Sequence, residues 1–239
     1  MTGAALTRPY YLDMKKKLDS YTGSLTAKQV AAGINAARAN ASRLIEDAKL
    51  LFNAKRYPSS TALCILAIEE AGKINVLRGL ALSMNAAELS SEWKEYRTHT
   101  SKNVMWIFPQ LAARGARKLE DFSSIFDKNA DHPYILDQLK QVAIYTDCLG
   151  KAHWSLPTVC IDEELAHTLL HTASLLCSDR EVTEEEIGLW VKHVGPAWHA
   201  NNALRLKALI SWHDEMVKRG LLAAEELGKM KQFIVEGYK

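Results

Sequence analysis

Three charged residues interrupt an apolar segment of the sequence, and their types and spacing suit chemistry. The stretch ALCILAIEEAGKINVL, residues 62–77, contains Glu69, Glu70 and Lys73 between apolar residues on both sides. A helix that is apolar nearly all round is a buried helix, and an unpaired buried charge is costly. On a helix Lys73 lies about one turn after both carboxylates, so the three groups are predicted to pair or to line a polar cavity. Gly72 leaves room beside them for another backbone or a ligand.

A second group of polar side chains follows in WKEYRTHTSKNVMW, residues 93–106. If this stretch is helical, His99, Lys102 and Asn103 lie on one face, with Lys94 and Arg97 close by. A histidine that takes or gives a proton near neutral pH, beside fixed cations and an amide, suits the handling of a phosphodiester. Consecutive helices joined by a short turn pack antiparallel, so this group can face the Glu69 cluster.

Both groups also have an interpretation without a reaction. Glu69 and Lys73 can form a buried ion pair that fixes the register of the helix. The group around His99 can be a solvated basic helix face that carries one incidental histidine. The residue types alone leave these alternatives open.

Helical periodicity covers most of the chain, and strand-type alternation is nearly absent. Thr26 and Gln29 form a predicted capping box at the start of a first helix, which is expected to stop before Pro58. Ser59 or Ser60 is expected to cap the second helix. Further helices are predicted over about 91–113, 118–127, 133–145, 162–176, 184–194, 197–219 and 221–236, the one at 184 opened by a second capping box, T-E-E-E186. Residues 155–162 are the one stretch that suggests an extended piece, so the predicted class is an all-α bundle.

The composition is that of an ordinary globular protein and excludes several classes. The formal charge of +2 gives no global attraction to phosphate polymers, so a nucleic-acid site must be a local patch. The four cysteines contain no C-x-x-C pair, which favours reduced thiols and a cytoplasmic protein. No apolar run is long enough for a membrane span, and no phosphate-loop, dinucleotide or serine-hydrolase motif is present. We therefore predict no cofactor and no membrane partner.

Two patterns in the second half of the chain have a functional and a structural interpretation. Glu163, His167 and His171 have a spacing that can bind a transition metal, but interleaved leucines favour the polar flank of an amphipathic helix, and we predict no metal. Three tryptophans with neighbouring histidines can stack on bases, but their helical spacing favours packing in a core; the tryptophans are Trp190, Trp198 and Trp212.

Three short motifs in this order resemble the AbiV family of abortive phage-infection proteins. They are E-E-A-G-K at 69–73, T-H-T-S-K at 98–102 and V-A-I-Y-T-D at 142–147 with a proline after it, and the resemblance covers about residues 28–178. It implies a helical bundle related to the HEPN superfamily. The residues that match are Glu69, Glu70, Lys73, His99 and Lys102.

The resemblance also implies a function. Many HEPN proteins are metal-independent ribonucleases that act as dimers, with an arginine four to six residues before the active histidine. None of the eight histidines here has that arginine, and Lys94, five residues before His99, is the nearest imitation. In a ribonuclease His99 would move the proton of the 2′-hydroxyl or the leaving oxygen, Lys102 and Arg97 would stabilise the developing charge, and Glu69 would orient His99 or Lys73.

We therefore expect a phage-defence protein that shuts down translation, either by cleaving RNA or, as the alternative, by binding as a non-catalytic toxin or phage-protein sensor. The predicted catalytic residues are Glu69, Lys73, His99 and Lys102, and the predicted binding residues are Glu70, Lys94, Arg97, Asn103 and Tyr145. The expected partners are RNA or the translation machinery, a second copy of the chain and a phage-encoded trigger. The expected organisation is an extension at 1–25, a HEPN-like bundle at 26–180, and a helical extension at 181–239 packed on the bundle.

Overall fold

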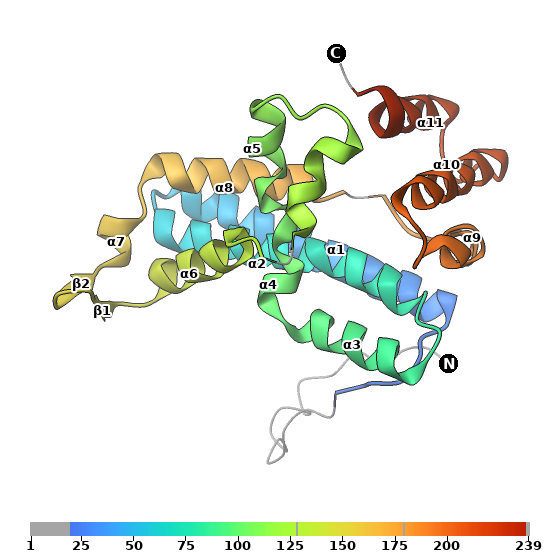
Figure 1. Cartoon of the computed structure of the whole chain (residues 1–239). Helices are drawn as coiled ribbons and strands as arrows, with labels where there is room; N and C mark the ends of the chain where they lie inside the picture. Colours follow the sequence, from blue (N-terminus) through green and yellow to red (C-terminus); the bar gives the residue numbers. More distant parts are fainter. Residues whose placement is uncertain (1–19, 128, 179, 238–239) are drawn as a thin grey trace.

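The computed structural model describes residues 20–127, 129–178 and 180–237, and helices account for most of them (Figure 1). The α-helices are α1 (Ala27–Asn53), α2 (Tyr57–Leu80), α3 (Ala86–Arg97), α4 (His99–Lys102), α5 (Phe108–Ala113), α6 (His132–Ile144), α7 (Pro157–Cys160), α8 (Glu163–Leu176), α9 (Glu184–Val194), α10 (Asn202–Lys218) and α11 (Ala224–Lys231). Short 3₁₀ segments cover Val104–Ile107, Leu119–Phe126 and Gly195–Ala197, and a π-helical turn covers Gln232–Glu236. The predicted all-α class is confirmed. The predicted extension at 1–25 lies outside the described residues up to residue 19.

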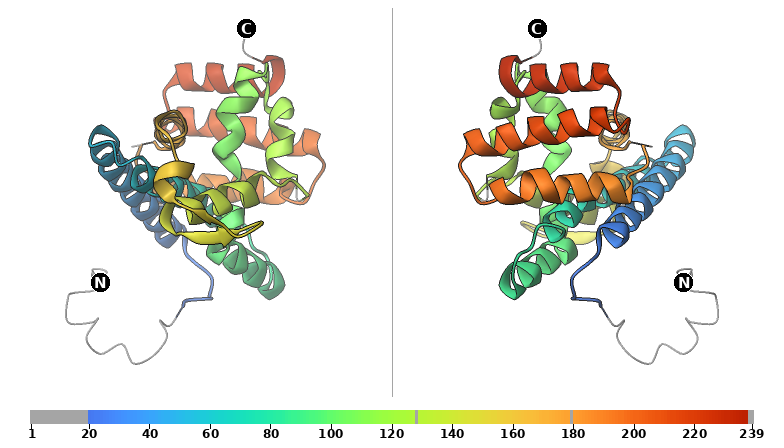
Figure 2. Two further views of the ribbon diagram at one scale, coloured as in Figure 1. Left: turned by 90° about the vertical axis from the view of Figure 1, so that its left-hand side faces the viewer. Right: turned by 90° about the vertical axis from the view of Figure 1, so that its right-hand side faces the viewer.

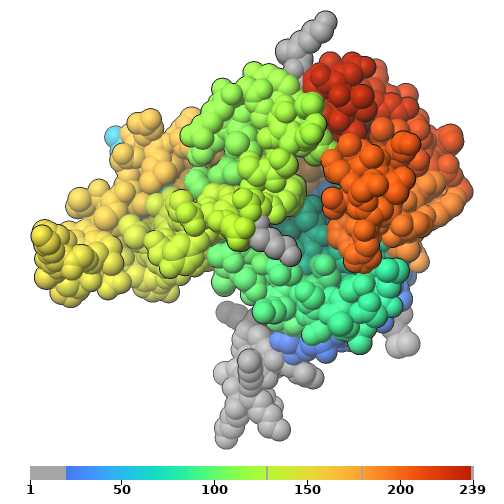
Figure 3. All heavy atoms as spheres, viewed as in Figure 1, coloured from blue at the N-terminus to red at the C-terminus, as the bar shows by residue number. Residues whose placement is uncertain are grey.

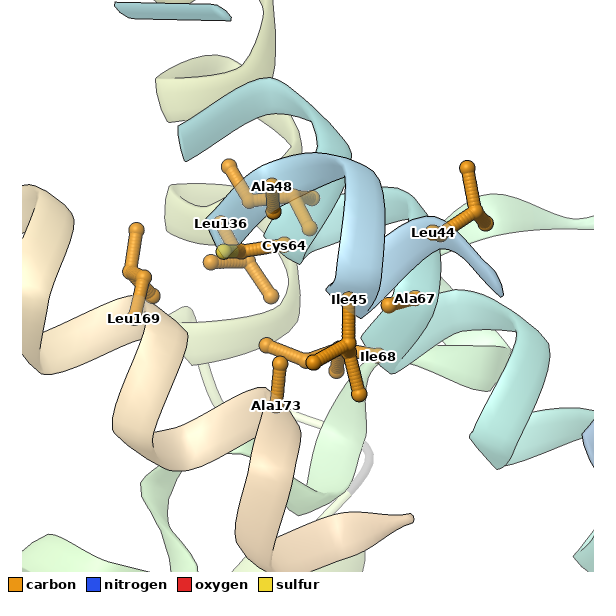
Figure 4. Packing of buried hydrophobic residues seen from close by; sticks show 10 residues of the cluster. Leu44, Ile45, Ala48, Cys64, Ala67, Ile68, Leu136, Leu169 and Ala173 are labelled. Carbon is orange, nitrogen blue, oxygen red and sulfur yellow. The ribbon is translucent and has the colours of Figure 1, made fainter. Parts of the chain in front are cut away.

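The long helices α1 and α2 pack side by side and carry the core. Figure 4 shows α1 and α2 side chains meeting those of α6 and α8. The cluster comprises Leu44, Ile45 and Ala48 of α1, Cys64, Ile65, Ala67 and Ile68 of α2, Leu136 of α6, and Leu169 and Ala173 of α8. Because α2 contributes apolar residues to several neighbours, an unpaired charge on its buried sides would be costly.

The ends of these two helices show which local signals hold. Thr26 and Gln29 form the predicted capping box at the start of α1. The predicted cap of α2 by a serine is wrong, because the helix already begins at Tyr57 and Ser60 lies inside it. The Ser60 hydroxyl instead donates to the carbonyl oxygen of Ala48 at 2.8 Å and ties α2 to α1.

The segment predicted as one helix over 91–113 is broken into short pieces. Helix α3 ends at Arg97, Thr98 has an extended backbone, and its hydroxyl donates to the Lys94 carbonyl oxygen. Hydroxyl side chains that bond back to the preceding turn weakly disfavour the helix, and this bond lies at the point where α3 ends. The chain restarts at His99 as α4, which contacts α2 and α6. His99, Lys102 and Asn103 therefore do not share a face of a long helix, as predicted, but belong to a single turn.

A small hairpin follows α6, and the sequence does not predict it. Strands β1 (Asp147–Leu149) and β2 (His153–Ser155) pair antiparallel, with positive φ angles at Gly150 and Ala152 in the turn. The extended piece predicted at 155–162 is wrong beyond Ser155, because Pro157 opens the short helix α7. In Figure 1 the hairpin lies at one end of the molecule, opposite α9–α11.

Helices α9, α10 and α11 lie in successive layers at the other end (Figure 2), and Figure 3 shows the C-terminal end of the chain against the segment around residues 105–125. Trp190 and Trp212 are buried and meet edge to face with ring centroids 5.0 Å apart, so the prediction that the tryptophans pack in a core is confirmed for these two. Helices α10 and α11 begin a few residues later than predicted, at Asn202 and Ala224. The division of the chain near residue 180 stays a prediction.

A buried carboxylate joins α9 to α2. Glu186 is 1% exposed and accepts hydrogen bonds from Arg78 of α2 at 2.9 Å and from Arg180 at 2.7 and 2.9 Å. Thr183 caps the backbone N–H of Glu186 as predicted, but the reciprocal half of the capping box is replaced by the arginine contacts. The guanidinium of Arg78 also lies 5.3 Å from the ring of Trp190.

None of the described helices has both the length and the apolar character that crossing a membrane requires.

Candidate functional site

Glu69 is the centre of a buried polar cluster. Its side chain lies on α2 and is 4% exposed. Oε2 is 2.6 Å from Nδ1 of His99, and Oε1 accepts a hydrogen bond of 2.6 Å from Nζ of Lys140. The predicted juxtaposition of Glu69 and His99 is therefore present, although the two residues are 30 positions apart in the chain.

Lys73 is the expected partner of both carboxylates, but it pairs with Glu70 and not with Glu69. Lys73 donates to Oε1 of Glu70 at 2.6 Å, and both side chains are about four-fifths buried. The Lys73 ammonium also lies 5.4 Å from the centre of the Tyr96 ring on α3. The two carboxylates thus take different partners because they point to different sides of α2.

Lys140 is the functional candidate that the sequence analysis missed. It lies on α6, is 6% exposed, and donates to Asp137 at 2.8 Å as well as to Glu69. Burial lowers the pKa of Lys140, but the hydrogen bonds to Asp137 and Glu69 outweigh burial and raise the pKa above its usual value. The ammonium is held in its charged form between two carboxylates. A signal was available, since Lys140 is the one charged residue in the buried stripe that also contains Leu136 and Ala143.

Gly72 allows α4 to approach α2 closely enough for this contact. A Cβ atom at Gly72 would overlap the backbone carbonyl of Lys102. The missing side chain therefore makes room for another backbone, which is one of the two uses expected from the sequence. Close approach of α4 brings His99, its first residue, over Glu69.

His99 presents one ring nitrogen to the outside. Its side chain is 57% exposed, whereas the carboxylate that it contacts is buried. Because an ionised carboxylate only accepts hydrogen bonds, Nδ1 carries the proton that points to Glu69. Nε2 has no hydrogen-bond partner among the described residues. The hydrogen bond to Glu69 thus fixes the orientation of the ring, and the second ring nitrogen faces solvent.

Lys102 has a mostly buried side chain whose ammonium still reaches solvent. Its side chain is 6% exposed, yet it forms no hydrogen bond or ion pair with any residue in the described ranges. Burial lowers the pKa of Lys102, and the charges of Lys73 and Lys140 lower it further, against the opposing effects of Glu69 and Glu70. An unpaired ammonium in the same helical turn as an exposed histidine is suited to a negatively charged ligand.

Lys102→Met is expected to raise the free energy of unfolding by about 0.5–2 kcal/mol, because it removes a desolvated charge. The folded-state pKa of Lys102 is depressed, so the cost of its charge is fully present below that pKa and declines as pH rises toward the unfolded value of about 10.4. Urea unfolding of both proteins at several pH values measures this, and the gap should narrow at alkaline pH. Lys49→Met, at an exposed position on α1, is the control. A destabilised Lys102→Met protein would contradict the assignment.

The remaining predicted binding residues lie around the cluster rather than in it. The Arg97 guanidinium donates to the backbone oxygens of Tyr21 and Trp93, so its hydrogen bonds serve the fold. The side chain of Lys94 is exposed on α3 and forms no ion pair in the described part of the chain. Neither cation contacts Glu69 or His99.

Asn103 and Tyr145 also lie away from the histidine. Asn103 is fully buried and donates to the carbonyl oxygen of Pro133 at 2.9 Å, which ties the end of α4 to the start of α6. Tyr145 follows the last residue of α6 and lines a separate cleft between α6 and the hairpin.

Among the described residues, no group of three or more His, Cys, Asp or Glu side chains is placed to hold a metal ion. His167 instead packs against the ring of Phe52.

Comparison with protein families places these residues in a known group. The sequence model of a HEPN family described as AbiV matches residues 29–178. The chain belongs to the AbiV family. The match contains Glu69, His99, Lys102 and Lys140, and AbiV membership implies an abortive-infection function of HEPN type in phage defence. Neither the curated proteins nor the solved structures gave a match to this AbiV protein.

Proposed function

We propose that this AbiV protein is a metal-independent endoribonuclease that shuts down translation during phage infection. The observation that carries the proposal is the hydrogen bond between buried Glu69 and Nδ1 of His99, which leaves Nε2 of an exposed ring unoccupied. A carboxylate that orients a histidine and stabilises its imidazolium form is a recurring element of acid–base catalysis.

The reaction that fits this geometry is transfer of the RNA phosphodiester to the neighbouring 2′-hydroxyl. Nε2 of His99 takes the 2′-hydroxyl proton while the 2′-oxygen forms a bond to phosphorus. The bond from phosphorus to the 5′-oxygen breaks, and that oxygen takes up a proton. The products are a 2′,3′-cyclic phosphate and a 5′-hydroxyl end. The unpaired ammonium of Lys102 contributes positive charge where the phosphate gains negative charge.

The proposed active form is a homodimer. The reaction needs a base for the 2′-hydroxyl and an acid for the leaving oxygen, and the Glu69 cluster of one chain presents one histidine. A two-fold pair of chains would bring two such clusters to one groove, so that one His99 serves as base and the other as acid. Lys94 and Arg97 contact neither Glu69 nor His99, so Lys102 takes the charge-stabilising role that the sequence analysis divided between Lys102 and Arg97.

The test is incubation of the purified protein with structured RNAs in the presence of EDTA. Cleavage by the wild type that leaves cyclic phosphate ends and disappears in His99→Ala is the expected result. His199→Ala is the matched control, because His199 is also exposed and faces a carboxylate, that of Glu88 at 3.5 Å. Cleavage that needs a divalent metal, or that survives in His99→Ala, would overturn the proposal.

A second candidate function is favoured by the missing arginine before His99. In this case the protein is a non-catalytic toxin or phage-protein sensor, and the same pocket recognises its ligand. Retention of RNA or of a translation component by the wild type, weakened in Lys102→Met and without cleavage, would support this alternative.

A further inference from the structure

A cleft of about 450 Å³ lies between the second half of α6 and one face of the hairpin. The α6 side contributes Gln138, Gln141, Val142 and Tyr145, which are spaced three and four residues apart and therefore share a side of the helix. In the hairpin Asp147 is paired with Ser155, and Leu149 is paired with His153, so Asp147 and Leu149 share a face. This is the face that lines the cleft, and the intervening pair, Cys148 and Trp154, points to the other side.

The lining combines flat apolar surface with free hydrogen-bonding groups. The Tyr145 side chain is 59% exposed, and Val142 and Leu149 provide the neighbouring apolar surface. The amides of Gln138 and Gln141 make no hydrogen bond with any residue that the structure describes. Each amide offers a donor and an acceptor, the pattern with which glutamine contacts the edges of bases.

The charge of the lining excludes a phosphate group as the occupant. No lysine or arginine lines this cleft, and Asp147 contributes a carboxylate with only one oxygen engaged, by the backbone N–H of Cys148. A free carboxylate oxygen repels phosphate but accepts hydrogen bonds from the amino or imino groups of a base. A neutral, flat heterocycle with N–H groups matches these features.

The cleft adjoins the catalytic cluster through α6. Gln138 and Gln141 alternate along the helix with Asp137 and Lys140, of which Lys140 pairs with both Glu69 and Asp137. Tyr145 follows Lys140 by five residues, which is about 7.5 Å along the axis. His99 is linked to the same helix through Glu69 and Lys140, so a strand that runs from His99 along α6 would reach the cleft.

The other cleft near α4 does not suit a nucleic-acid strand. It has a volume of about 600 Å³ and is lined by Glu92, Glu95 and Asp127. Burial and the nearby charge of Glu95 raise the pKa of Glu92, in keeping with an acidic environment. The path toward α6 is therefore the more favourable one for a polyanion.

We propose that the cleft between α6 and the hairpin is a nucleobase subsite for single-stranded RNA, in which Tyr145 stacks on a base and Gln138 and Gln141 bind its edge. This assignment rests on the proposed function for its biological meaning, but binding of a nucleoside can be measured without cleavage. Bases stack on exposed aromatic side chains in many proteins that bind single strands.

The test is saturation-transfer NMR of the full-length protein with adenosine, guanosine, cytidine and uridine, which carry bases but no phosphate. Saturation is expected at the base protons of at least one nucleoside, with at least about five-fold weaker binding by Tyr145→Leu, since stacking on one aromatic ring contributes about 1–3 kcal/mol. Gln141→Ala should change the order of preference among the four. Tyr134→Leu is the control, because Tyr134 is 60% exposed but lines the acidic cleft.

The outcomes separate this assignment from the proposed function. His99→Ala should bind nucleosides like the wild type, since its imidazole does not line the cleft. If the wild type binds nucleosides but cleaves no RNA, the proposed ribonuclease function is rejected and the subsite proposal is kept. Absence of nucleoside binding, or binding that is equal in Tyr145→Leu and the wild type, would overturn the subsite even if the protein cleaves RNA.

Discussion

Lys140→Met is expected to lower the free energy of unfolding by about 3 kcal/mol, the lower end of the cost of breaking a buried ion pair. The substitution leaves the apolar packing of α6 nearly unchanged but removes the ammonium between Glu69 and Asp137. Glu69 then remains buried but keeps its hydrogen bond to His99. We therefore expect a cost near the lower end of the range for a broken buried ion pair. Chemical unfolding followed by circular dichroism measures the change, and RNA cleavage should fall with it because Glu69 no longer has a fixed orientation.

Two further variants show whether the loss comes from the stranded carboxylate. Lys118→Met removes a surface pair with Glu120 and should change stability by less than about 1 kcal/mol. In the double variant Glu69→Gln with Lys140→Met neither charge is buried, so most of the lost stability should return while cleavage stays low. Equal effects of Lys140→Met and Lys118→Met would show that the contact contributes little.

The pH dependence of this contribution follows from the direction of the pKa shift. The pKa of Lys140 is raised in the folded protein, so its stabilising effect is fully present below the unfolded value of about 10.4. It is lost only as pH rises through the still higher folded value. The difference between wild type and Lys140→Met should therefore be constant across neutral pH.

Gly72→Ala is expected to separate α4 from α2 and to abolish the contact between His99 and Glu69. The new Cβ would overlap the Lys102 carbonyl oxygen, which is backbone and cannot turn away as a flexible side chain can. Overpacking of this kind costs about 1–3 kcal/mol, and we expect the upper part of that range. The intrinsic preference of alanine for helices, about 1 kcal/mol over glycine, offsets only part of it. Thermal unfolding measures stability, and the EDTA-resistant cleavage assay measures the site.

Gly188→Ala provides the matched control. Gly188 lies in the middle of α9, and a Cβ there would meet no atom within 4 Å. This variant should be more stable than the wild type by about 0.5–1 kcal/mol and should keep full activity. If Gly72→Ala behaved like Gly188→Ala, the close approach of α4 would have no role in building the site.

The sequence singled out most members of the buried polar cluster but not all of the contacts between them. Glu69 could be singled out because a charge on an apolar helix requires a partner, and His99 because of its chemistry and its neighbours. Their contact was anticipated from antiparallel packing of consecutive helices, and it is present, although α3 and α4 are separate pieces. The capping box at Thr26 was predictable because it is a local hydrogen-bonding pattern.

The features that escaped prediction depend on contacts between distant segments. Lys140 lies 71 positions after Glu69, and nothing local to α6 specifies which carboxylate it meets. Lys73 lies within one turn of both Glu69 and Glu70, and spacing alone does not specify which carboxylate it meets. The break at Thr98, where the backbone is extended, leaves no mark in the helical periodicity of the sequence. Strands of three residues carry too little alternation to be seen.

The contacts of the Glu186 carboxylate link the stability of the central helices to that of α9 and α10. The AbiV match stops at residue 178, whereas Arg78, inside the match, depends on Glu186 for its counter-charge and on Trp190 and Trp212 for its cover. Without α9 and α10, a guanidinium on the central helix would lose its anion, and the apolar surface around Leu77 would lose Val182 and Ile187. We therefore expect the segment that matches the family to be less stable alone than in the full chain, and the two parts to unfold in one thermal transition.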